Sequence, residues 1–203
     1  MPSRKETSKA DAPLPRVFVL RGPPGVGKST VAHKIIPLLG REKKALVPID
    51  VLQHFDHRGI SEDKIKLGVY HAVIICRSFV REGFDVVVES VFNKHLDFFI
   101  EKLFTSHSGS TDPCILYLAY LDAPLTKIIE RNSTRPDEMP RSVLTKLYNE
   151  ADITKGMPGE IVIDTGLRSM NPKKIAKSVI ENPYCLHEAG KILSAPSLNG
   201  LAE

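Results

Sequence analysis

The segment that most constrains this 203-residue chain is residues 22–29, GPPGVGKS, which matches G-x-x-x-x-G-K-[ST] at every fixed position. An apolar, β-rich run precedes it at residues 16–20, and a helical pattern follows at 30–36. A loop between a strand and a helix directs backbone N–H groups and the positive end of the helix dipole at one point. We therefore predict a loop that binds the phosphates of a nucleoside triphosphate. A chance glycine-rich turn would lack these flanks.

The residue types of this loop suit phosphate binding. Glycines let the backbone approach phosphate oxygens closely, since a Cβ would block the approach or the required φ angles. The Lys28 ammonium is expected to reach the β- and γ-phosphates, and the Ser29 hydroxyl to bind Mg²⁺. The predicted nucleotide-binding residues are Gly22, Pro23, Pro24, Gly25, Val26, Gly27, Lys28, Ser29 and Thr30.

Composition narrows the class of protein. The chain is 42% hydrophobic and 26% charged, values that are ordinary for one globular α/β domain. It has no apolar run of membrane-spanning length and no hydrophobic signal-peptide core. Its three cysteines lack metal-ligand spacing and are expected to be buried, reduced thiols, so we expect a cytoplasmic location. The net charge of +4 permits nucleic-acid binding without indicating it.

Strand and helix patterns alternate along residues 15–182. Strands are predicted at 45–49, 85–89, 114–121 and 161–163, and Pro48 suggests that its strand lies at a sheet edge. Helices are predicted from the cap Ser61 to Gly83, over 96–104, from Pro124, over 143–151 and from Asn171. This order predicts a three-layer P-loop NTPase-type parallel sheet with helices on both faces. Residues 1–14 are predicted to be a flexible leader and 183–203 a partly disordered tail.

Four acidic residues fall at the ends of predicted strands: Asp50, Glu89, Asp122 and Asp164. The carboxyl ends of parallel strands face the ligand crevice, where a carboxylate can bind Mg²⁺ or take a proton from a hydroxyl. Asp50 and Glu89 flank the phosphate loop, so a functional role is favoured for both. Asp122 precedes Ala123 and is better explained as a helix cap.

Two arginines end the helix that starts at Pro124. Arg131 and Arg135 are spaced i and i+4, which would place them on one helix face, and a proline-interrupted stretch follows. Guanidinium groups on such a lid would stabilise the transferring phosphoryl group and exclude water. The alternative is a solvated basic helix end, favoured by the helix dipole.

Together these motifs resemble small P-loop kinases, above all the group of polynucleotide 5′-kinases, chloramphenicol phosphotransferase and zeta toxins. The resemblance covers about residues 16–180, and its most specific part is the phosphate loop. It implies transfer of the γ-phosphate of Mg-ATP to a hydroxyl of a small-molecule or nucleotide/polynucleotide acceptor. It also implies that Asp50 is the general base, that Arg131 and Arg135 form the lid, and that residues 164–166, Asp-Thr-Gly, lie near the adenine. Glu89, from its position at a strand end, is the carboxylate predicted to help hold the metal.

The acceptor side departs from that family. An arginine commonly follows the base by three residues, but Gln53 stands there, and the nearest basic candidates are His54, His57 and Arg58. Phe55 with the two histidines could stack on a base or an aromatic acceptor. Residues 92–95, Phe-Asn-Lys-His, either contribute to the acceptor pocket or lie on the surface. His33, inside the first helix, is interpreted as structural.

Three other nucleotide-dependent functions were considered. A GTPase switch needs N-K-x-D, whereas residues 93–97 read NKHLD, one residue too long and too early. A motor ATPase usually ends an apolar strand in paired acids, but Val88-Glu89-Ser90 supplies one. A binding scaffold without turnover would not need Lys28, Ser29 and Asp50. The sequence favours a kinase, with an ATPase or GTPase acting as a switch or binding module as the alternative.

Overall fold

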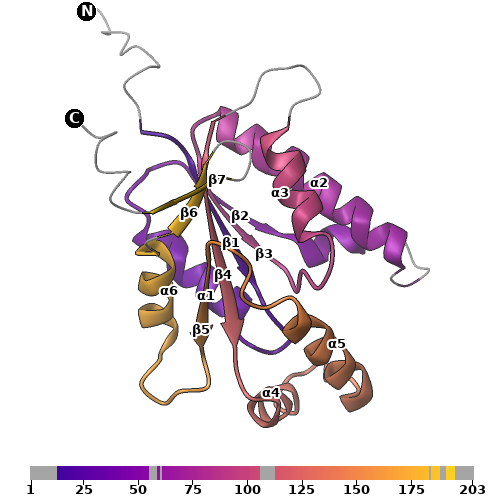
Figure 1. The fold of residues 1–203 in the computed structure, drawn as a ribbon. Helices are drawn as coiled ribbons and strands as arrows, with labels where there is room; N and C mark the ends of the chain where they lie inside the picture. Colours follow the sequence, from indigo (N-terminus) through magenta and orange to yellow (C-terminus); the bar gives the residue numbers. More distant parts are fainter. Residues whose placement is uncertain are drawn as a thin grey trace, which may run out of the picture.

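The computed structural model describes residues 13–54, 59, 61–105, 113–182, 184–187 and 191–194 (Figure 1). Most of the predicted leader, the acceptor-side candidates Phe55, His57 and Arg58, and the end of the predicted tail lie outside the described residues. Within the described part of the chain, no helix is both long and apolar enough to span a membrane.

A parallel sheet forms the centre of the molecule. Its strands are β1 (Arg16–Arg21), β2 (Lys44–Pro48), β3 (Asp85–Glu89), β4 (Ile115–Asp122) and β5 (Glu160–Asp164). The order is β2-β3-β1-β4, and β5 pairs with the carboxyl half of β4. β2 is the edge strand, as Pro48 predicts. Because β1 lies between β3 and β4, the loop that follows β1 emerges at the middle of the sheet.

Helices cover both faces of this sheet (Figure 1). α1 (Lys28–Ile35) and α6 (Pro172–Ile180) pack on one face, where their apolar residues join those of β1 and β4 in one core. α2 (Glu62–Arg81) and α3 (Leu96–Phe104) pack on the other face in a second core. The predicted three-layer α/β architecture is therefore confirmed.

Local signals account for several helix starts. The Ser61 side chain accepts from Lys64 N at 3.4 Å, and the Asn171 side chain accepts from Lys173 N and Lys174 N at 3.1 and 3.0 Å. The interpretation of Asp122 as a cap is wrong. Helix α4 (Leu125–Asn132) has Pro124 as its N-cap residue, so Asp122 lies too early, and its carboxylate pairs with Lys155 Nζ at 2.5 Å.

Two short strands continue the sheet beyond the predicted elements. β6 (Tyr184–His187) pairs antiparallel with the amino end of β4, and β7 (Lys191–Ser194) pairs antiparallel with β6. β5 and β6 thus share one edge of β4. Each new strand has four residues, too few to show an alternation in sequence.

The remaining helices lie at the carboxyl end of the parallel strands. α4 packs against α5 (Arg141–Ile153), and Figure 1 shows both beyond the end of β4. A buried ion pair holds the end of α5 to the sheet: Arg21 Nε donates to Glu160 Oε1 at 2.5 Å, and Arg21 Nη1 donates to Thr154 Oγ1 at 2.8 Å. Both charged side chains are almost completely buried. Through its bond to Thr154, Arg21 therefore holds the end of α5 next to the start of the phosphate loop.

Candidate active site

Two glycines explain the path of the phosphate loop. Gly22 has φ +138°, and a Cβ built on it would lie 2.2 Å from the Leu121 carbonyl oxygen of the neighbouring strand. Gly27 has φ +103° and is the residue that precedes α1. Neither position suits an L-residue with a side chain. The loop can therefore wrap tightly and direct the first N–H groups of α1 at one point.

Lys28 is buried at the base of this loop. Its ammonium donates to the carbonyl oxygens of Gly22 and Pro23, each at 3.1 Å. Burial lowers the pKa of Lys28, while the charges of Asp50 and Glu89 act in the opposite direction. The site thus holds a cation that is poorly solvated by water and that an anionic ligand would stabilise.

Ser29 and Glu89 meet at the end of β3. Ser29 Oγ donates to Glu89 Oε2 at 2.9 Å, and Glu89 is buried as the last residue of its strand. A hydroxyl and a carboxylate are oxygen donors of the kind that Mg²⁺ prefers. The described residues contain no group of three or more His, Cys, Asp or Glu side chains that could hold a metal. One or two protein ligands, with the rest supplied by phosphates and water, is the usual arrangement for Mg²⁺.

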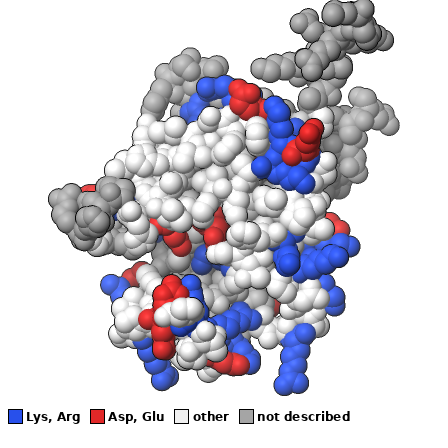
Figure 2. All heavy atoms as spheres, turned by 180° about the vertical axis from the view of Figure 1, so that it is seen from behind, with Lys and Arg blue, Asp and Glu red and all other residues white. Residues whose placement is uncertain are grey.

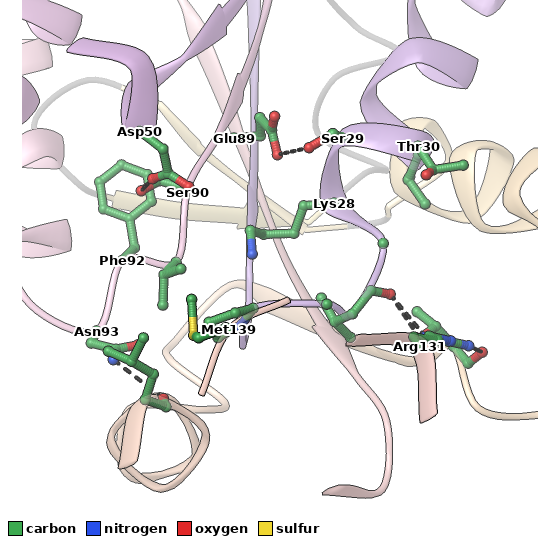
Figure 3. A pocket seen from close by; sticks show the side chains of 18 of the residues that line it. Lys28, Ser29, Thr30, Asp50, Glu89, Ser90, Phe92, Asn93, Arg131 and Met139 are labelled. Atoms are coloured by element: carbon green, nitrogen blue, oxygen red, sulfur yellow. Dashed lines mark hydrogen bonds between the residues drawn. The ribbon is translucent and has the colours of Figure 1, made fainter. Parts of the chain in front are cut away.

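Asp50 lies two residues beyond β2, in the short helix η2 (Ile49–Gln53). Its Oδ1 accepts from Ser90 Oγ at 2.8 Å, and Ser90 is buried directly after β3. This bond fixes the carboxylate and leaves its second oxygen available. Figure 3 shows Asp50 and Ser90 on one side of Lys28 and Arg131 on the other. Sequence reasoning did not assign a role to Ser90, which is recognisable only once β3 and η2 are placed together.

A cavity of about 980 Å³ joins these groups. One end is formed by the phosphate loop, Thr165 and the start of α6, and the other by Asp50, the loop after β3 and α5. Of the predicted site residues, the cavity brings together Pro24 to Thr30 with Asp50, Glu89, Arg131 and Arg135. Gly22 and Pro23 take part through the carbonyl oxygens that hold Lys28.

Arg131 is a bridge between two loops. Its guanidinium donates to Val26 O at 3.2 Å, to Thr165 Oγ1 at 3.1 Å and to Thr165 O at 2.8 Å. It therefore holds the phosphate loop against the loop that follows β5. The expectation that Arg131 and Arg135 share a helix face is wrong, because α4 ends at Asn132 and Arg135 lies in the turns beyond it.

Arg135 is exposed and lies on a loop that a buried asparagine closes. Asn132 Nδ2 donates to Met139 O at 2.8 Å, and Asn132 Oδ1 accepts from Met139 N at 3.1 Å. Between these residues the chain presents Arg135 and Asp137 to the cavity. Arg135 is close enough to Lys28 that its charge contributes to lowering the Lys28 pKa. Of the two arginines, Arg135 is thus the more exposed, and its charge acts on Lys28 of the phosphate loop.

Asp164 is the last residue of β5 and Thr165 follows it, in the segment that the resemblance placed near the adenine. The Asp164 carboxylate accepts from Gly166 N at 2.7 Å and is not among the described residues that line the cavity. Thr165 lines it, and its hydroxyl donates to Val26 O at 3.1 Å. Within the predicted segment 164–166, the bonds of Thr165 to Arg131 and to the phosphate loop distinguish it from Asp164.

The loop after β3 is strained where it meets the cavity. Phe92 and His95 have φ of +48° and +64°, an unfavourable region for bulky residues. The Phe92 ring is buried against Phe99, with ring centroids 5.5 Å apart. His95 Nε2 lies 2.8 Å from Glu62 Oε1, and Asn93 Nδ2 donates to Leu147 O at 3.3 Å. These contacts hold the strained loop between α2 and α5.

No protein-family model matches the chain, and comparison with curated proteins gives no match. Solved structures do match. A sugar kinase from Janibacter sp. has a TM-score of 0.62 at 18% identity, over 84% of this chain and 94% of its own. A gluconokinase from Sinorhizobium meliloti has a TM-score of 0.59 at 18% identity, over 84% and 93%. The APS kinase CysC from Mycobacterium tuberculosis has a TM-score of 0.57 at 18% identity, over 84% and 98%.

The chain has the fold of the small P-loop kinases. The resemblance predicted from the motifs agrees with this fold. The match extends over most of both chains. At 18% identity it shows the fold and leaves the acceptor to be argued from the site.

The two arginines should respond differently to alanine. Arg131→Ala removes bonds to two loops and should lower stability by about 1–3 kcal/mol as well as slowing turnover. Arg135→Ala should leave the free energy of unfolding within about 0.5 kcal/mol of wild type yet slow phosphoryl transfer roughly ten- to thousandfold. Thermal melts and initial rates measure both. Arg141→Ala, an exposed arginine outside the cavity, is the control. Normal turnover in Arg135→Ala would assign that residue to the surface.

Proposed function

We propose that the protein transfers the γ-phosphate of Mg-ATP to a hydroxyl group of a second substrate. The observation that carries this proposal is the position of Asp50. Its carboxylate lines the same cavity as Lys28 and Ser29, and the cavity continues beyond it to Asn93 and Glu150. A site for hydrolysis alone would not need this additional space. The space can hold an acceptor whose hydroxyl meets both the carboxylate and the phosphate loop.

Each residue then has a defined task. Asp50 accepts the proton of the acceptor hydroxyl, and Ser90 keeps the carboxylate oriented. Lys28 and Arg135 stabilise negative charge on the phosphoryl oxygens. Ser29 and Glu89 would hold Mg²⁺, which, when bound, neutralises charge on the β- and γ-phosphates. Arg131 positions the phosphate loop through Val26.

The structural neighbours include kinases named for small acceptors: a gluconokinase, a sugar kinase, and an APS kinase in complex with AMPPNP and APS. They also include a chain of the Pnkp1/Rnl/Hen1 RNA repair complex, so the surface of this protein decides between a small and a polynucleotide acceptor. Figure 2 shows Lys and Arg side chains in several separate groups on the face in view, rather than in one continuous basic stripe. A long nucleic-acid groove would require such a stripe. A small-molecule acceptor is therefore the better hypothesis.

The cysteines support a reducing compartment. All three, Cys76, Cys114 and Cys185, fall in the described part of the chain, where they are buried thiols that form no disulfide. Burial raises the pKa of Cys76 and of Cys185, so neither favours the reactive thiolate. These properties support the cytoplasmic location expected from the sequence.

Labelled ATP tests the proposed activity. The purified protein is incubated with [γ-³²P]ATP, Mg²⁺ and a panel of sugars, amino sugars, amino alcohols, nucleosides, antibiotics and 5′-hydroxyl oligonucleotides. We expect label in one class of acceptor, lost on chelation of Mg²⁺. Release of labelled phosphate at the same rate with and without every acceptor would instead support a switch NTPase.

A further inference from the structure

The two ends of the cavity carry opposite charge. The phosphate end holds the cations Lys28, Arg131 and Arg135. At the far end, the acidic lining residues are Asp50, Glu62 and Glu150, and Lys94 is the one lysine or arginine among the described residues there. The proposed acceptor would occupy this acidic end.

Lys94 forms an ion pair with Glu62. Its ammonium lies 3.6 Å from Glu62 Oε2, and the other oxygen of Glu62 is 2.8 Å from His95 Nε2. The bond from His95 lowers the pKa of Glu62, so this carboxylate stays ionised at neutral pH. The Lys94 and Glu62 side chains are both exposed, so this ion pair is weak in water, and the described lining of this end carries three carboxylates against one ammonium.

Glu150 reaches this end of the cavity from α5. Its Oε2 accepts from Asn93 Nδ2 at 3.3 Å, a neutral donor. Among the described residues, the cation that pairs with Glu150 is Lys146, at 3.9 Å on the same helix with an exposed side chain. A pair of this kind is weak in water. The described part of the chain thus compensates the charge of Glu150 only weakly.

Asn93 adds an oxygen that no donor satisfies. Its Nδ2 is directed at α5, while its Oδ1 is buried and is the one buried side-chain polar atom without a partner in the described part of the chain. Figure 3 shows Asn93 below Phe92 at the edge of the cavity. A buried acceptor atom without a partner is costly unless a ligand or water donates to it. It therefore favours a ligand rich in donors.

Apolar side chains complete this end. Ile65, Phe92, Met139 and Leu147 line the cavity next to the two carboxylates. Such a surface suits a carbon framework, with polar recognition left to a few groups.

We infer that the acceptor is a hydroxyl compound bearing an ammonium group, such as an amino sugar or amino alcohol. This inference rests on the proposed phosphotransferase function. The ammonium interacts with Glu150 and the Asn93 oxygen, while a hydroxyl on the same molecule lies at Asp50. A sugar acid or a nucleotide acceptor would bring a further negative charge toward the carboxylates of Asp50 and Glu150. Lys94 alone does not offset the resulting repulsion.

Compounds matched in hydroxyl pattern and different in charge test this inference. Glucosamine, N-acetylglucosamine and glucuronate are compared as acceptors by label transfer, and as ligands by thermal shift with AMPPNP and Mg²⁺ present. Ethanolamine and kanamycin extend the ammonium class. We expect kcat/KM for the best ammonium compound to exceed that of the neutral and acidic compounds at least about tenfold, the effect of about 1.4 kcal/mol.

Substitutions at Glu150 locate the discrimination. Glu150→Gln should reduce the preference for the ammonium compound about tenfold, mainly through KM, and Glu150→Lys should favour glucuronate. Glu130→Gln is the matched control, since Glu130 is exposed on α4 and lies outside the cavity. Transfer to a neutral or acidic hydroxyl in preference to every ammonium compound would overturn the inference and leave the kinase intact. Absence of transfer to any hydroxyl compound would overturn both.

Discussion

Asp50→Asn should bind Mg-ATP normally and lose acceptor phosphorylation by about two to four orders of magnitude, the usual contribution of a general base. Asparagine keeps the shape of the side chain and an oxygen that can accept from Ser90. It cannot take the proton that leaves the acceptor hydroxyl as the new P–O bond forms. The defect should therefore appear in kcat, with the thermal shift produced by AMPPNP and Mg²⁺ unchanged.

Two further variants make this result specific. Asp164→Asn is the matched control, because Asp164 also ends a parallel strand but bonds to Gly166 N and lies outside the cavity lining. Glu89→Gln should raise the Mg²⁺ concentration needed for activity as well as lowering the rate, since Glu89 accepts from the Ser29 hydroxyl. If Asp50→Asn transfers phosphate at a near-normal rate, Glu89 becomes the better candidate for the base.

The sequence predicts the fold well because its strongest signals are local. The phosphate loop, the cap at Ser61 and the proline of β2 each depend on neighbouring residues, and each occurs where it was expected. The alternation of strands and helices predicts the parallel sheet, while the order of its strands is a finding of the structure. β6 was missed because it is stabilised by pairing with the distant β4, and β7 because its four residues show no pattern of their own and pair with β6.

Site residues that belong to one sequence motif could be predicted, whereas contacts between residues from distant segments could not. Lys28 and Ser29 follow from the loop sequence, but Ser90 gains its role by reaching Asp50, 40 residues away. Arg131 illustrates the same limit: its spacing suggested a free lid arginine, whereas its guanidinium bonds to Val26 and Thr165. Contacts between loops depend on tertiary packing, which helix periodicity does not contain.

The sequence also does not show which charged side chains form ion pairs with each other. Arg21 would be expected at the surface, yet it is buried against Glu160 with additional bonds to Thr154. Breaking a buried pair by removing one partner typically costs several kcal/mol because the other charge is left unpaired. The ion pair therefore helps to support the phosphate loop. Arg21 and Glu160 come together only because β5 pairs with β4.

Lys28→Met should abolish phosphoryl transfer while leaving the free protein at least as stable as wild type. Removing a charge that stabilises the transferring phosphoryl should cost about a hundred- to thousandfold in rate or more. Methionine keeps much of the length of the buried stem but does not place an ammonium in a poorly solvated site. Because burial lowers the Lys28 pKa, the folded state holds this proton less tightly than the unfolded state does.

The sign of that linkage gives a second readout. Well below the lowered pKa, the wild type carries the full cost of its buried ammonium, so the variant should melt at the same or a higher temperature in that pH range. As the pH rises toward the ordinary lysine pKa of 10.5, the wild type should recover stability and the difference should narrow. Lys34→Met, on the exposed side of the same helix, should show neither effect. Retained turnover in Lys28→Met would contradict the role of Lys28 as a phosphate-binding cation. A clear loss of stability below the lowered pKa would contradict the inference that the burial of Lys28 is maintained at the expense of stability.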